Sequence, residues 1–268
     1  MSKVFVIDLA KCNGCHNCQI ACKDEHCEQA WPPYAEAQPE IGQFWIKVEQ
    51  TVRGQVPWVK LAYKPVIGAQ TEAIREFAPE VCMEREDGLI VIDPAKAKGR
   101  KDIAEKFEGV YWNEELQIPQ GCTGCAHLLD DGWTEPRCVD ACATDALFFG
   151  DEEDFAKEIK EAKGSFGGHV EGAKVYYLHA PQRFIAATVV DFSVEEVVIG
   201  ARVNVYDEND SLAATAITDD FGDFFIKDIP AGRYKVEVQE WGFKTLVVEA
   251  DVTERDLSLG ALSLEKQA

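Results

Sequence analysis

Nine of the ten cysteines in this 268-residue chain fall into two tight groups. Cysteines separated by two or three residues in a reducing compartment are metal ligands more often than disulfide partners. We therefore expect thiolate ligation, with iron or zinc as the metal. The first group is Cys12, Cys15, Cys18, Cys22 and Cys27, the second is Cys122, Cys125, Cys138 and Cys142, and Cys82 stands apart.

The first group has the C-x2-C-x2-C-x3-C spacing of bacterial ferredoxins, in which three thiolates bind one cubane and the fourth binds its neighbour. The second group supplies a C-x2-C pair and, after a twelve-residue loop, a C-x3-C pair. Gly14 suits a tight loop that points its N–H groups at sulfide. Interleaving the groups assigns Cys12, Cys15, Cys18 and Cys142 to one 4Fe-4S cluster, and Cys22, Cys122, Cys125 and Cys138 to a second.

Two zinc sites of four thiolates each would also use eight cysteines. Zinc sites usually pair two C-x2-C motifs, so the third cysteine of the first group fits them poorly. Iron-sulfur clusters are therefore favoured. We expect Cys27 and Cys82 to be packing or spare thiols, because free cysteine is often buried. His16 and His26 lie near the thiolates, and we expect them to face solvent or form hydrogen bonds rather than bind metal.

The chain is strongly acidic, with 48 Asp+Glu against 27 Lys+Arg and a net charge of -21. This charge argues against nucleic acid and anionic membranes as partners. No apolar run reaches the roughly 18 residues that span a bilayer, and the first residues lack a signal-peptide pattern. We therefore expect a cytoplasmic protein, although a folded subunit can also be exported with a signal-bearing partner. No catalytic triad, carboxylate pair or phosphate-binding loop is convincing, so we expect no catalytic residue.

Short apolar runs flank the two cysteine groups. Residues 4–8 precede the first group and residues 146–149 follow the last cysteine, and we expect them to pair as neighbouring strands. Acidic residues lead a predicted helix over 151–163, in which Phe155 and Ile159 have helical spacing. These elements indicate an α+β, ferredoxin-like domain over 1–183.

From residue 184 to 268, short apolar runs recur every eight to twelve residues between turn signals. This spacing predicts an antiparallel β-sandwich as a second domain. The acids at 207–210 and 219–223 are candidate calcium ligands, but we expect solvated turns, because Asp and Asn are common turn formers. Trp241 and Phe243 flank Gly242, and we expect them to pack in the sandwich core or at its edge.

Several motifs resemble the iron-sulfur subunits that accompany molybdopterin enzymes of the dimethyl sulfoxide reductase family. The resemblance covers nearly the whole chain, and within the class it is strongest to small subunits of pyrogallol-phloroglucinol transhydroxylases, resorcinol hydroxylases and catechol dehydroxylases. The sandwich also resembles carboxypeptidase-regulatory and Cna-B-type domains. The matching motifs are V-F-V-I-D-L-A-K-C-N-G-C-H-N-C-Q-I-A-C-K-D-E-H at 4–26, W-P-P-Y at 31–34, R-E-D-G-L-I-V-I-D-P-A-K-A-K-G at 85–99, G-C-T-G-C-A-H-L-L at 121–129, P-R-C-V-D-A-C-A-T-D-A-L-F-F-G-D at 136–151 and K-V-Y-Y-L at 174–178.

The resemblance implies a large partner subunit carrying molybdenum on two pterins, in a heterodimer or a multiple of it, where phenolic aromatics react. It also implies two pseudo-ferredoxin units with four cysteine groups. Between about 64 and 112, where the middle groups belong, this chain has Cys82 alone. One thiolate cannot hold a cubane, so we expect the second unit to lack clusters. Ala143 is a lesser departure, since proline commonly follows the last cysteine.

The leading hypothesis is a non-catalytic electron-transfer subunit with two 4Fe-4S clusters. One alternative is a free-standing two-cluster ferredoxin, which the insertion between the cysteine groups and the appended sandwich argue against. Another is a zinc-stabilised structural adaptor with no redox role. Iron, sulfide and zinc content distinguishes the adaptor from the other two.

Overall fold

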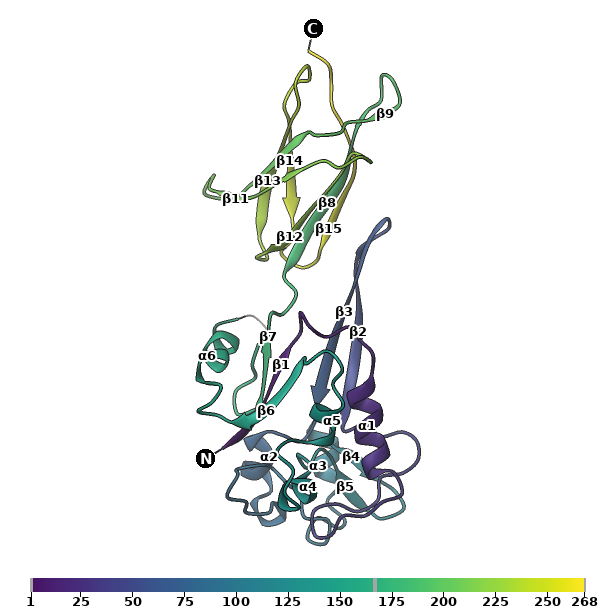
Figure 1. The fold of residues 1–268 in the computed structure, drawn as a ribbon, viewed down its shortest axis with the longest axis vertical. Helices are drawn as coiled ribbons and strands as arrows, with labels where there is room; N and C mark the ends of the chain where they lie inside the picture. Colours follow the sequence, from purple (N-terminus) through teal and green to yellow (C-terminus); the bar gives the residue numbers. More distant parts are fainter. Residues whose placement is uncertain (1, 166–167, 268) are drawn as a thin grey trace. The chain divides into compact units, whose positions relative to one another are not determined.

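A computed structural model describes residues 2–165 and 168–267. The chain divides into two compact units, which are Met1–Gln50 with Tyr63–Ala180, and Thr51–Ala62 with Pro181–Ala268. The first unit mixes short helices and strands, whereas the second consists of strands (Figure 1). Within the described ranges, no helix is long and apolar enough to cross a membrane.

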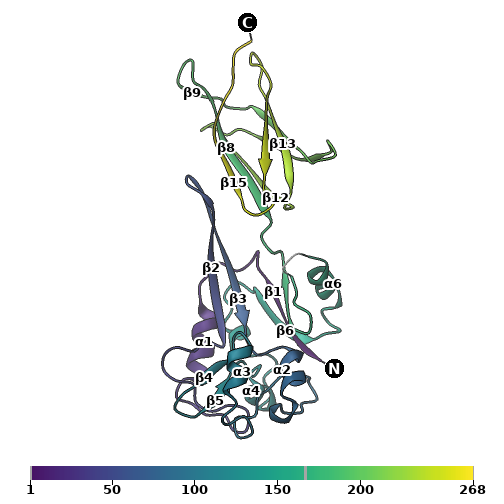
Figure 2. The same ribbon diagram turned by 180° about the vertical axis from the view of Figure 1, so that it is seen from behind.

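A three-stranded sheet joins the two ends of the first unit. Strand β1 (Lys3–Asp8) lies between β6 (Leu147–Asp151) and β7 (Val175–Leu178), as Figure 1 and Figure 2 show. It pairs antiparallel with β6, with Phe5 opposite Phe149, and parallel with β7. The predicted pairing of 4–8 with 146–149 is confirmed, and it brings the two cysteine groups to the same end of this sheet.

The helix predicted over 151–163 begins later than expected. Helix α6 spans Ala156–Gly164, because β6 continues through Asp151, which pairs with Lys3 of β1. Lys3 Nζ also lies 3.0 Å from Asp151 Oδ2. The acidic start that favoured a helix is therefore held in the sheet by cross-strand pairing, which overrides local propensity.

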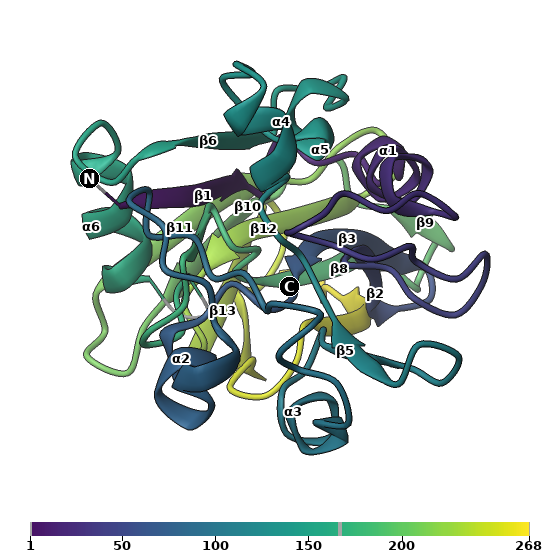
Figure 3. The same ribbon diagram turned by 90° about the horizontal axis from the view of Figure 1, so that it is seen from below.

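Short elements between β1 and β6 carry the cysteines. Helix α1 lies against α5, and Figure 3 shows α4 beside them. The principal hydrophobic core of this unit contains Cys18, Cys22 and Cys138 together with Trp45 and Leu89. The thiols are therefore built into the core. The elements are α1 (Asn17–His26), β4 (Tyr111–Asn113), β5 (Ile118–Gln120), α4 (Ala126–Asp130) and α5 (Arg137–Asp140).

The segment expected to have lost its clusters has an apolar core of its own. Ten buried residues between Ala69 and Val110 form this cluster, and Ile74, Ile90 and Ile103 are fully buried within it. Cys82 is the only cysteine among them. Aliphatic side chains thus fill this segment. Its helices are α2 (Glu72–Phe77), the 3-10 turn η1 (Pro79–Val81) and α3 (Lys101–Lys106).

The hairpin of β2 (Ile46–Gln55) and β3 (Trp58–Ile67) contributes its tip to the second unit. There Arg53 Nη2 donates to Asp256 Oδ1 over 2.7 Å, and Arg53 Nε donates to Asp256 Oδ2 over 3.0 Å. Both side chains are largely buried. A bidentate pair of this kind fixes geometry as well as charge. The sequence placed residues 51–62 in the first domain, whereas their contacts join them to the second unit.

The second unit is a β-sandwich of two sheets, β11-β10-β13-β14 and β12-β8-β15, with β9 pairing to β8. Alternating residues such as Val203, Val205, Val236 and Val238 fill its core. The expected sandwich is present, but not fully antiparallel, because β15 reaches β8 from the other sheet and pairs in parallel. The strands are β8 (Arg183–Asp191), β9 (Glu196–Val197), β10 (Arg202–Tyr206), β11 (Leu212–Ile217), β12 (Asp223–Ile229), β13 (Arg233–Gln239), β14 (Leu246–Asp251) and β15 (Leu257–Ser263).

Candidate iron-sulfur site

Four cysteines, here called the surface quartet, come from the two ends of the cysteine-bearing segment. Cys12 and Cys15 lie in the loop before α1, Cys18 lies in the first turn of α1, and Cys142 follows α5. Cys15 is exposed, and Cys12 and Cys142 are half-buried. Burial raises the pKa of the Cys18 thiol to about 12, and the charges of Cys142, Cys12 and Cys15 raise it further. The structure therefore brings these four thiols together.

The other four cysteines, here called the buried quartet, lie deeper in the core. Cys22 lies on α1, Cys122 and Cys125 lie in the loop between β5 and α4, and Cys138 lies on α5. Burial raises the pKa of Cys138 well above its usual value, and the charges of Cys125, Cys22 and Cys122 add to the rise. Burial also raises the pKa of Cys122 to about 11 and that of Cys125 to about 12. The eight thiols thus lie in the two sets that the spacing predicts.

Each C-x2-C loop turns on a glycine in the left-handed region. Gly14 has φ of +73° and Gly124 has φ of +65°, a conformation that costs other residues free energy. A Cβ on Gly14 would lie 2.4 Å from the Tyr63 ring, and a Cβ on Gly124 would lie 2.7 Å from Leu89 Cδ1. The two loops therefore need glycine both for the turn and for close packing.

Backbone N–H groups point at thiol sulfurs, as a cluster requires. The Gly124 N–H donates to Cys122 Sγ over 3.3 Å, and the Ala146 N–H donates to Cys142 Sγ over the same distance. Burial raises the pKa of Cys142, but amide donors of Ala146, Thr144 and Leu147 outweigh it, so that its pKa lies below the usual value. These donors stabilise a thiolate.

Buried polar atoms beside the buried quartet fit a charged group at this place. Thr123 Oγ1, between Cys122 and Cys125, is buried and has no protein hydrogen-bond partner. His26 Nδ1 and His127 Nδ1 are likewise buried without a partner. Unpaired buried polar groups are costly, so they indicate a missing polar neighbour. The donor set and these atoms together fit an iron-sulfur cluster.

Two buried histidines flank the buried quartet. The His127 ring stacks on Trp31 at 4.5 Å between centroids, and His127 Nε2 lies 3.0 Å from Glu25 Oε1. His26 is 1% exposed, packs against Trp45 at 4.5 Å, and has a pKa lowered to about 3 by burial. The expectation that His26 faces solvent or forms hydrogen bonds through its ring is wrong at Nδ1. His16 agrees better with it, with Nδ1 3.4 Å from Gln19 Oε1.

The structure places Cys27 and Cys82 outside both quartets. Cys27 caps the end of α1 and is half-buried, whereas Cys82 is buried in the apolar cluster of residues 69–110, and burial raises its pKa. Sequence reasoning overlooked Thr123 and His127. The C-T-G-C-A-H run at 122–127 places them beside two of the thiols, a signal that was available in the sequence.

The acidic turns of the sandwich cap their own backbones. Asp207 Oδ1 accepts from the Asn209 and Ser211 amides, and Asp219 Oδ1 accepts from the Phe221 and Asp223 amides. These bonds agree with turn formation. Trp241 does not pack as expected, since 94% of it is exposed, whereas Phe243 packs against the sandwich core.

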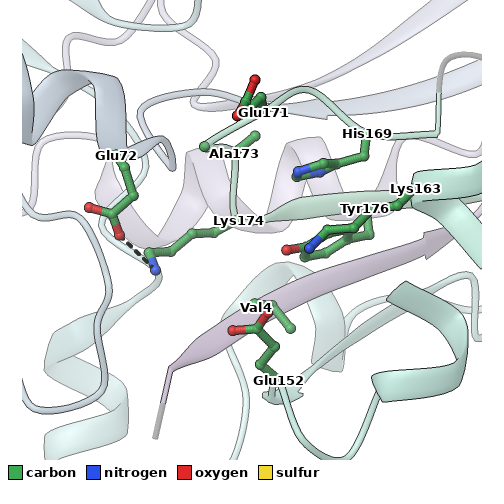
Figure 4. Close-up of a pocket in the computed structure, with 10 residues that line it drawn as sticks. Val4, Glu72, Glu152, Lys163, His169, Glu171, Ala173, Lys174 and Tyr176 are labelled. Carbon is green, nitrogen blue, oxygen red and sulfur yellow. Dashed lines mark ion pairs between the residues drawn. The ribbon is translucent and has the colours of Figure 1, made fainter. Parts of the chain in front are cut away.

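A cavity of about 450 Å³ lies on the opposite face of β1 from the thiols (Figure 4). Lys174 Nζ lies 2.9 Å from Glu72 Oε1 there, and the His169 and Tyr176 rings stack at 4.3 Å. No cysteine is among its described lining residues. We therefore assign the redox chemistry to the quartets and not to this cavity.

Fold and thiols together define an iron-sulfur protein with an appended β-sandwich. The family described as a 4Fe-4S dicluster domain matches residues 71–152, and the carboxypeptidase regulatory-like domain matches residues 185–259. The first match begins after the first cysteine group, so it includes Cys122, Cys125, Cys138 and Cys142 but not their four partners.

The small subunit of pyrogallol hydroxytransferase from Pelobacter acidigallici is 33% identical, over 97% of this chain and 98% of that one. This protein belongs to the family of iron-sulfur small subunits that contains that relative. A putative dimethyl sulfoxide reductase iron-sulfur subunit from Halobacterium salinarum is 24% identical over 62% of this chain and 72% of that one. A subunit of the anaerobic dimethyl sulfoxide reductase of Escherichia coli is 28% identical over 58% and 76%.

Proposed function

We propose that this chain is the electron-transfer subunit of a molybdenum enzyme that acts on phenolic aromatics, with one 4Fe-4S cluster on each quartet. The observation that carries the proposal is the gathering of eight thiols, from two distant parts of the sequence, into two sets of four. When bound, each cluster supplies reversible one-electron storage. The ligands would be Cys12, Cys15, Cys18 and Cys142, and Cys22, Cys122, Cys125 and Cys138.

The chain's own residues give the two quartets different roles. Cys15 is exposed, so the surface quartet is the one that an outside electron donor or acceptor can approach. Side chains such as Trp45 and Leu89 exclude water from the buried quartet, and burial and hydrogen bonding tune the potential of such a site. Cys18 and Cys22 lie one turn apart on α1, which brings the quartets close together.

The partner would be a large subunit with molybdenum on two pterins, and the aromatic substrate would react there. Support comes from the family, in which the 33% identical relative is a small subunit of a hydroxytransferase. Because ligand thiolates are committed to iron, this chain would hold no catalytic residue. The heterodimer, or a multiple of it, would lie in the cytoplasm, where the ten unpaired cysteines would stay reduced.

Two clusters, and not four, would be present. The apolar cluster within 69–110 supports this count, since aliphatic side chains stabilise the segment where further clusters would need thiolates. The cysteine-bearing domain, residues 1–183, would thus consist of one loaded and one unloaded pseudo-ferredoxin unit. The sandwich would occupy 184–268.

Anaerobic purification followed by iron, acid-labile sulfide and zinc assays tests the clusters. We expect about eight iron and eight sulfide per chain. About two zinc without sulfide would favour the structural adaptor, and a spectroscopic count above two cubanes would contradict the assignment of 64–112. An affinity pulldown should recover molybdenum and a large chain. A stable lone monomer with eight iron would favour a free-standing ferredoxin.

A further inference from the structure

One end of the sandwich exposes large apolar side chains on three turns and the adjoining strand β9. Single exposed apolar residues are common, whereas a contiguous group marks an interaction site. Trp241 is 94% exposed and Phe221 is 74% exposed. We call this group the apolar end, and it comprises Phe192, Val194, Val197, Ile199, Phe221 and Trp241.

Backbone contacts bring the three turns together. The Val189 N–H donates to Gly222 O over 2.7 Å, which holds the Phe221 turn beside the end of β8. Lys266 Nζ lies 3.1 Å from Asp191 Oδ2, and the Gln267 N–H donates to Gly242 O over 2.9 Å. The Trp241 turn therefore also lies near the end of β8. Phe192 follows directly on this strand, and β9 pairs with it (Figure 1).

Carboxylates surround the apolar end. Lys266 and Lys244 are each paired with a carboxylate, and Arg202 at the start of β10 adds a further cation. Acids still outnumber these cations. The surface would therefore repel a second copy of itself, nucleic acid and anionic lipid, and it complements an apolar surface rimmed by Lys and Arg. The exposed acids are Glu195, Glu196, Asp219, Asp220 and Glu240.

The comparisons indicate which partner carries that surface. The match to the hydroxytransferase small subunit spans 97% of this chain and so includes the sandwich, whereas the match to the Escherichia coli dimethyl sulfoxide reductase subunit covers 58%. The sandwich thus accompanies the hydroxytransferase type of small subunit. A docking surface on it serves a partner of that same complex.

We propose that the apolar end docks on the catalytic subunit, at an apolar patch with a basic rim. This inference rests on the proposed function. Phe221 and Trp241 are its central contacts, because exposed aromatic side chains contribute most when an interface buries them. The acidic rim speeds association and selects the partner.

The test uses the co-purified complex, with dissociation followed by analytical ultracentrifugation on dilution. Phe221→Ser and Trp241→Ser should each weaken association about tenfold or more, because each removes a buried aromatic contact. The matched control is Leu212→Ser, an exposed apolar residue on the β10-β11 turn, which should leave association unchanged. Equal affinity of the two aromatic variants and wild type would overturn the proposal.

Charge reversal provides a second, independent variant. Glu195→Lys with Glu196→Lys should slow association and flatten its salt dependence, whereas Glu208→Lys, on the turn between β10 and β11, should not. Unchanged iron content and melting temperature establish that each variant is folded. If wild type binds no large subunit, the proposed function itself fails. If the isolated chain dimerises through Trp241, the docking proposal alone fails.

Discussion

The two thiol quartets have the same ligand chemistry in opposite surroundings. The surface quartet includes exposed Cys15 and half-buried Cys12 and Cys142, whereas Cys22 and Cys138 of the buried quartet lie in the main hydrophobic core. Ligand spacing therefore specifies which thiols assemble, but packing decides what each assembly contributes. A cluster on the buried quartet is part of the core, and a cluster on the surface quartet is an accessible redox centre.

The largest expected effect comes from removing one ligand from each quartet. Cys138→Ser should reduce iron from about eight to fewer than four per chain, because metal binding is coupled to folding and this thiol lies in the core shared by both quartets. Cys15→Ser should keep at least about four iron, because the buried quartet stays intact. Anaerobic iron and sulfide analysis checks both variants. Equal iron retention would contradict the division into a structural and an accessible quartet.

Release of iron to a chelator should separate the quartets in time. A ferrous chelator added to the reduced protein should remove about half of the iron in a fast phase and the rest slowly, because only the surface quartet has an exposed ligand. Cys15→Ser supplies the control, since it should lack the fast phase. Release in a single phase from wild type would contradict the comparison.

The glycines of the two loops offer a smaller contrast. Alanine at either position meets the left-handed penalty of about 1–2 kcal/mol. At Gly124 the new Cβ also meets fully buried Leu89, which adds about 1–3 kcal/mol of overpacking. At Gly14 it meets half-buried Tyr63, which can turn toward solvent. Gly124→Ala should therefore lower the anaerobic melting temperature more than Gly14→Ala, and the reverse order would be a contradiction.

Sequence reasoning grouped the thiols correctly because ligand spacing is a local property. Three ligands within seven residues can reach only neighbouring iron corners, so Cys12, Cys15 and Cys18 had to act together and Cys142 completed the set by the same rule. The pairing of β1 with β6 followed, since the second group must return to the first. Short-range covalent constraints thus carried long-range information.

Features decided by packing were beyond sequence reasoning. His26 lies one turn after Cys22, and no local pattern shows that Trp45 and His127 enclose its ring. Trp241 is exposed although its residue type favours burial. The parallel pairing of β15 with β8 depends on where the chain crosses between sheets, and alternation of apolar residues reads the same in either direction.

The smallest expected effect concerns acid sensitivity at the buried quartet. Burial lowers the pKa of His26 to about 3, against 6.5 in an unfolded chain, so the unfolded state binds more protons between these pH values. The free energy of unfolding should therefore fall by up to about 1.4 kcal/mol per pH unit as pH drops below 6.5. His26→Phe fills the site without a titrating group and should remove this dependence in anaerobic melts from about pH 7.5 to about 5.5. His16→Phe retains His26 and should keep the wild-type slope, whereas equal slopes in wild type and His26→Phe would show that this histidine does not couple the core to pH.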